Sequence, residues 1–63
     1  MAELFVDGRG TALRATWHED AGVVVLSLWR GDACIGTVRL SAQEADRLGA
    51  FLADVVARHP LPT

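Results

Sequence analysis

The segment from Leu13 to Leu40 is apolar on both faces of the three strands that it predicts. Short runs rich in β-branched residues alternate with turn signals, a pattern typical of hairpins. The pattern predicts strands over about 3–6, 11–18, 23–30 and 33–40, separated by turns that each contain glycine. Because turns this short join antiparallel strands, we expect a four-stranded antiparallel sheet.

After residue 40 the apolar positions change to helical spacing. Ser41 and Glu44 stand three residues apart, as in a capping box, which predicts a helix beginning at residue 42. One apolar stripe follows, formed by Ala45, Leu48, Leu52 and Val55 and widened by Phe51 and Val56. Pro60 should end the helix near His59 and leave residues 61–63 as a frayed tail. The chain is therefore predicted to be one α+β domain of β-β-β-β-α order, with its helix over about 42–58.

Strand pairing assigns the strand residues to two faces of this sheet. A two-residue turn at 31–32 places Trp29 opposite Cys34, and it also places Leu28 opposite Ile35 and Leu26 opposite Thr37. One face then carries Leu13, Ala15, Trp17, Val24, Leu26, Leu28 and Ile35, and we expect the helix to cover it. The opposite face carries Arg14, Thr16, His18, Val23, Val25, Ser27, Trp29, Cys34, Gly36 and Val38. A register error of one residue would exchange the two faces of a strand.

Length makes association with a partner the expected source of stability. A 63-residue chain buries only about 60% of the surface that its unfolded form exposes. One cysteine, Cys34, excludes an internal disulfide, and the two isolated histidines, His18 and His59, predict no structural zinc site. One helix can cover only one face of the sheet. We therefore expect a homodimer centred on the opposite face, with the contact residues Trp29, Val23, Val25, Val38 and Arg14.

Charge and composition bear on the partner. The net charge of −2 and the pI near 5.4 supply no general attraction to phosphate, so nucleic acid is not the expected partner. The alternative interpretation is binding of single-stranded nucleic acid on the sheet through Arg14, Trp29 and Arg39. All six basic residues are arginine, which is typical of a GC-rich bacterial genome. No signal peptide or membrane span is predicted, and we expect a cytoplasmic protein.

Candidate catalytic and metal-binding residues have simpler explanations. The consecutive residues 18–20, His-Glu-Asp, do not converge on one point, and the Arg-Gly-Asp of 30–32 is explained by turn chemistry. Cys34 has no neighbouring histidine in the sequence and sits within a strand, which favours a small structural residue over a nucleophile. We therefore expect that the protein is not an enzyme and that it binds neither a cofactor nor a metal ion.

Residues 36–44, Gly-Thr-Val-Arg-Leu-Ser-Ala-Gln-Glu, lead from the last strand into the helix, and residues 29–32 read Trp-Arg-Gly-Asp. With these features the whole chain resembles very small actinobacterial proteins and, more loosely, the BldB and WhiJ-associated developmental proteins. The second resemblance implies a dimeric accessory to transcriptional regulators. The element order also resembles the PC4-like coactivators, which dimerise and bind single-stranded DNA, although this chain lacks their lysine-rich strands. We interpret the chain as a non-catalytic homodimeric protein-interaction module that accompanies a bacterial regulatory protein.

Overall fold

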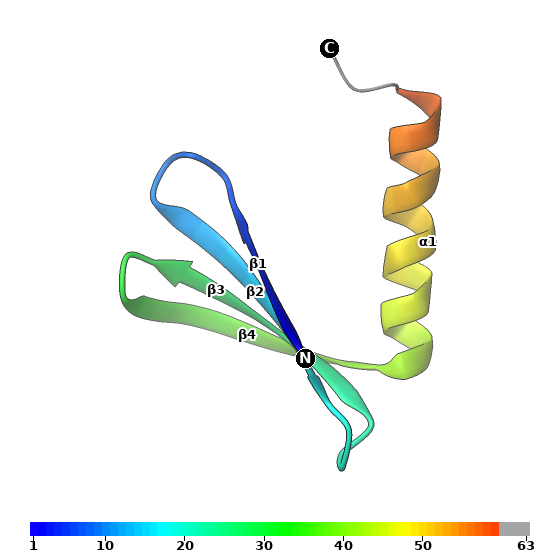
Figure 1. The fold of residues 1–63 in the computed structure, drawn as a ribbon, viewed down its shortest axis with the longest axis horizontal. Coiled ribbons are helices and arrows are strands. Elements are labelled where there is room, and N and C mark those ends of the chain that lie inside the picture. The colour runs from blue at the N-terminus through cyan, green and yellow to red at the C-terminus, as the bar shows by residue number, and fades with distance from the viewer. Residues whose placement is uncertain (60–63) are drawn as a thin grey trace.

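A computed structural model describes residues 1–59 (Figure 1), and these residues form four strands and one helix. The elements are β1 (Ala2–Val6), β2 (Thr11–His18), β3 (Val23–Arg30), β4 (Ala33–Ser41) and α1 (Ala42–Arg58). The strands form one antiparallel sheet in the order β1-β2-β3-β4. The α+β fold is thus confirmed, with element bounds within one residue of those predicted. The predicted stop at Pro60 and the frayed tail lie outside the described residues.

The hairpin turns are determined by local chemistry. Gly31 has a φ of 61° in the two-residue turn that pairs Arg30 with Ala33, and glycine adopts this conformation without strain. In the first turn, the Asp7 carboxylate accepts hydrogen bonds from the Arg9 backbone N–H at 2.8 Å and from its guanidinium at 2.8 and 3.0 Å. These hydrogen bonds hold the pKa of Asp7 below its ordinary value, and the bond from the Arg9 backbone N–H makes the largest contribution.

One β-bulge changes the predicted register between β3 and β4. Trp29 pairs with Cys34 as predicted, but Leu28 pairs with Gly36 and Leu26 with Val38. Ile35 is the extra residue between these pairs, and the glycine beside it is typical of a bulge. The predicted partners of Leu28 and Leu26, Ile35 and Thr37, were therefore wrong. The β2–β3 register is as predicted throughout.

The bulge exchanges the two faces of β4 beyond Ile35, because side chains alternate along a strand. What we call the leucine face carries Glu3, Phe5, Thr11, Leu13, Ala15, Trp17, Val24, Leu26, Leu28, Arg30, Ala33, Gly36, Val38 and Leu40. What we call the tryptophan face carries Ala2, Leu4, Val6, Ala12, Arg14, Thr16, His18, Val23, Val25, Ser27, Trp29, Cys34, Thr37, Arg39 and Ser41. Placing Gly36 and Val38 on the tryptophan face was therefore wrong, and Ile35 occupies the bulge.

The helix α1 stands away from the sheet instead of covering it (Figure 1). It starts on the side of the leucine face, where Leu48 and Phe51 line an open hollow together with Val38. Ser41 is both the last residue of β4 and the N-cap of α1, so no loop separates the two elements. Folding a helix back onto its own sheet takes a reversing connection of several residues. The expectation that the helix covers this face was thus wrong, and Leu28 on the sheet and Leu52 on the helix are 46% and 52% exposed.

The described chain encloses no hydrophobic core. Among residues 1–59, Ser27 is buried and no hydrophobic residue is. Large exposed apolar side chains lie on all four strands and along α1, among them Phe5, Leu28, Val38, Phe51 and Leu52. The chain exposes 5247 Å², against about 4,000 Å² for a compact protein of its mass. Its radius of gyration of 13.2 Å likewise exceeds the value of about 11 Å for a compact domain of this length.

Half of the predicted capping box forms at the start of α1. The Ser41 hydroxyl accepts a hydrogen bond from the Glu44 backbone N–H at 3.1 Å. The Glu44 carboxylate instead accepts from the Arg47 guanidinium at 2.9 and 3.0 Å, one turn further along. The serine cap is therefore the contact that fixes where the helix begins.

Replacing Ser41 by alanine should lower the free energy of unfolding by about 0.5–2 kcal/mol, because one amide of the first turn loses its acceptor. Urea denaturation followed by circular dichroism measures this loss. Ser41→Asp retains an acceptor and serves as the control, with stability near that of the wild type. An unchanged denaturation midpoint for Ser41→Ala would show that the cap does not stabilise the helix.

Candidate interaction surfaces

The Trp29 side chain is held in place by a short chain of hydrogen bonds on the tryptophan face. Its indole Nε1–H donates to the Ser27 hydroxyl at 3.0 Å, and that hydroxyl donates to the Arg14 carbonyl oxygen at 3.5 Å. Ser27 is only 8% exposed, so this anchor is shielded from water. The polar edge of the indole is therefore satisfied within the chain, while the half-buried ring leaves apolar surface for a partner.

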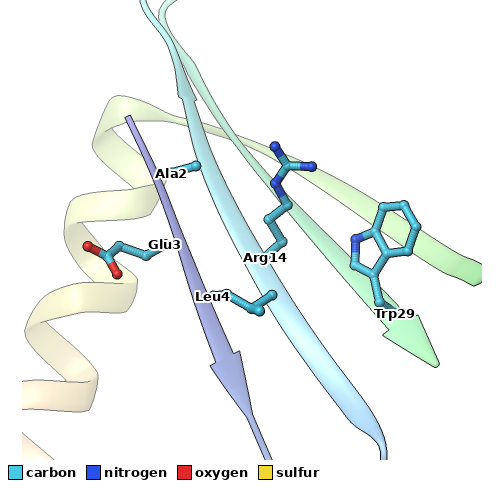
Figure 2. A pocket seen from close by; sticks show the side chains of 5 residues that line it. All are labelled: Ala2, Glu3, Leu4, Arg14 and Trp29. Carbon is cyan, nitrogen blue, oxygen red and sulfur yellow. The ribbon is translucent and has the colours of Figure 1, made fainter. Parts of the chain in front are cut away.

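A shallow hollow of about 390 Å³ lies beside Trp29, lined by residues of β1, β2 and β3. Figure 2 shows Leu4, Arg14 and Trp29 projecting from the same face, whereas the Glu3 carboxylate is turned away from them. The hollow thus combines an apolar floor with one guanidinium. Such a combination suits an apolar or planar group that lies next to an anion.

The predicted residues of this face fall into two groups. Arg39 pairs with Val25, which is four residues from Trp29 along β3, or about 13 Å at the rise of a strand. Arg39, Val23 and Val25 line a separate hollow with His18. The structure therefore brings Arg14 to Trp29 but leaves Arg39 apart, and it places Val38 on the other face.

Charge on the tryptophan face is positive. Arg14 and Arg39 both lie there. Glu3 is the only carboxylate in the four strands, and its pairing with Ala15 places it on the leucine face. This distribution favours an acidic ligand or partner segment, in spite of the net negative charge of the chain.

The leucine face is the second candidate surface, and α1 makes it concave. A wedge of about 480 Å³ opens between the sheet and the first turns of the helix. Its apolar lining is Leu26, Val38 and Leu40 from the sheet and Leu48 and Phe51 from the helix. Further apolar hollows continue over this face around Phe5 and around Trp17. The surface is thus continuous from β1 to α1.

Sequence reasoning missed this open surface because it assigned the helix to it. One signal could have revealed it: Ser41 is both the last residue of β4 and the N-cap of α1, so the chain has no loop in which to turn the helix back. The bulge likewise had a signal in Gly36, since an isolated glycine in a strand pattern indicates a bulge.

Potential metal ligands do not cluster in the described part of the chain. Among residues 1–59, no three His, Cys, Asp or Glu side chains lie together so that they could hold a metal ion. Cys34 is exposed, and its thiol lies 3.8 Å from the Gly36 carbonyl oxygen. Over the same residues, no helix has the length and apolarity needed to span a membrane.

Two surfaces of different character thus remain as candidates for function. The tryptophan face carries two arginines around a half-buried tryptophan, and the leucine face continues into the exposed apolar stripe of α1. Comparison with protein-family models, curated proteins and solved structures finds no match for this chain.

Proposed function

We propose that this chain is a non-catalytic protein-interaction module that works as a homodimer. The observation that supports this most strongly is the absence of any buried hydrophobic residue within residues 1–59 of a chain that is 51% apolar. Single folded proteins seldom expose apolar patches beyond a few hundred Å². Chains of this size usually gain added stability from a disulfide, a metal or a partner. A second copy would provide the missing core.

The tryptophan face is the surface that this module offers to another protein. Tryptophan and arginine are the residues most enriched where binding energy concentrates in protein interfaces. Trp29 and Arg14 lie together here, with Arg39 further along the same face. The partner segment should therefore be acidic and carry an apolar group for the hollow beside Trp29. Its place beside a bacterial transcriptional regulator stays a prediction from the resemblance.

Single-stranded nucleic acid is the second candidate partner for this face. The observation that favours it is the guanidinium of Arg14 next to the ring of Trp29, because bases stack on aromatic rings beside cations. Against it stand the separation of Arg39 from that pair and the net charge of −2. Stacking platforms of this kind use several aromatic rings, and the other tryptophan, Trp17, lies on the leucine face.

Homodimer formation predicts that thermal stability depends on protein concentration. If unfolding also dissociates two chains, mass action raises the melting temperature as the concentration increases. Circular dichroism melts over a wide range of concentration measure this directly. A melting temperature independent of concentration would show that each chain folds alone, which contradicts the proposed homodimer.

The two candidate partners can be separated by fluorescence. In Trp17→Phe the only remaining tryptophan is Trp29, and a titration with a single-stranded oligonucleotide at low and high salt reports on its face. We expect the oligonucleotide to cause no salt-sensitive quenching of the Trp29 fluorescence. Salt-sensitive quenching that disappears in the control Trp17→Phe/Arg14→Ala would favour nucleic acid as the partner, because phosphate contacts make binding salt-dependent.

A further inference from the structure

The open leucine face and the apolar stripe of α1 match each other in size and chemistry. The helix has 17 residues and is therefore about 25 Å long, and the eight residues of β2 or β3 span about 27 Å. Both surfaces are apolar, and both are exposed in the single chain. Within one chain they meet only at the first turns of α1, around Leu48 and Phe51, and the rest of the helix stands away from the sheet (Figure 1).

We propose that α1 of each copy packs on the leucine face of a second copy, so that the two chains exchange helices around a two-fold axis. This inference rests on the proposed homodimer and specifies its contact. A two-fold contact uses the same patch on both subunits, and here each chain carries both halves, a helix and a sheet face. The occupant of the wedge is therefore a second copy of this chain.

Accessible area supports this arrangement. The chain exposes roughly 1,200 Å² more than a compact protein of its mass. A standard interface removes about 800 Å² of accessible surface from each partner, which is less than this excess. Exposed apolar side chains are most numerous on the leucine face and α1, where Val38 and Phe51 are 55% and 62% exposed, although Leu4 and Val6 of the tryptophan face are also 60% and 74% exposed. The centres of both sheet faces are half-buried, around Trp29 on one side and Leu26 on the other. What favours the leucine face is the exposed apolar stripe of α1 beside it, which a homodimer contact on the tryptophan face would leave uncovered.

The charges on α1 also suit such a contact. Glu44 pairs with Arg47 at 2.9 Å, and Asp54 pairs with Arg58 at 3.1 Å. These ion pairs lie along the helix beside the apolar stripe and balance one another. These four charges of α1 are therefore already paired within the helix, and Glu3 and Arg30 are the charged groups of the leucine face itself. The exchange also leaves both tryptophan faces of the dimer uncovered, one on each sheet.

Cysteine cross-linking tests the exchange. In a Cys34→Ser background, Leu28→Cys on the sheet and Leu52→Cys on the helix are combined in one chain and treated with a short bismaleimide. We expect the covalent product to be a dimer on a denaturing gel. A product cross-linked within one chain would mean that the helix folds back onto its own sheet, which overturns the exchange.

Two controls make the outcome specific. Thr16→Cys with Leu52→Cys places one thiol on the tryptophan face, and this pair should not cross-link. Ala15→Cys with Val55→Cys probes the same two surfaces with smaller changes in side-chain size. This second pair tests the exchange if the protein with the first pair does not fold. A protein that is dimeric in solution but links at neither pair would overturn the exchange and leave the homodimer standing. A protein that is monomeric in solution would overturn both.

Discussion

Phe51→Asp is expected to dissociate the dimer and unfold the chain. In the single chain this side chain is 62% exposed, which alone would predict a small effect. In the exchanged dimer it lies between α1 and a partner sheet, where removing a phenylalanine ring costs about 3–5 kcal/mol and an unpaired carboxylate costs more. Circular dichroism should therefore show loss of structure together with a fall in sedimenting mass.

Ala50→Asp is the matched control for this substitution. Ala50 is exposed on α1 and lies outside the apolar stripe. The same carboxylate there should cost less than about 1 kcal/mol, from helix propensity alone. A folded, dimeric Phe51→Asp protein would contradict the placement of α1 in the contact.

Leu28→Ala is expected to lower the free energy of unfolding by about 2–5 kcal/mol, the cost of a leucine removed from a closed core. Leu28 is only half-covered by its own chain, at 46% exposure, so a loss of this size requires a covering partner. Denaturant unfolding at a fixed protein concentration measures it. Because dimer stability depends on concentration, variant and wild type must be compared at the same one.

Leu4→Ala provides the comparison on the opposite face. Leu4 lies on the tryptophan face and is 60% exposed, and its loss should cost less than about 1 kcal/mol. A larger loss in the free energy of unfolding for Leu4→Ala than for Leu28→Ala would place the homodimer contact on the tryptophan face. That outcome would agree with the hypothesis drawn from the sequence and contradict the helix exchange.

The strands, the helix and their bounds could be predicted because their signals are local. Glycines at the turns and the Ser41 cap act within a few residues, and the structure shows both. The β2–β3 register followed from the turn between these strands. The β3–β4 register did not, because Ile35 bulges out and shifts every later residue of β4 to the opposite face. Val38 was misplaced for this reason.

The position of the helix could not be predicted from its periodicity. An apolar stripe indicates that α1 has a face to bury, but not which surface will bury it. The connection at Ser41 carries that information, since a strand that passes directly into a helix directs the helix away from its own sheet. The candidate surfaces were predictable to the same extent. Strand pairing alone was enough to place Arg14 and Trp29 on one face. The open leucine face could not be predicted, because it depends on the position of α1.

Sedimentation equilibrium over a wide range of protein concentration tests the central claim most directly. The account predicts a folded species of twice the chain mass of 6.8 kDa that dissociates on dilution with loss of structure. A folded species of 6.8 kDa at every concentration would contradict it, because a single chain would then be stable without any buried hydrophobic residue among residues 1–59.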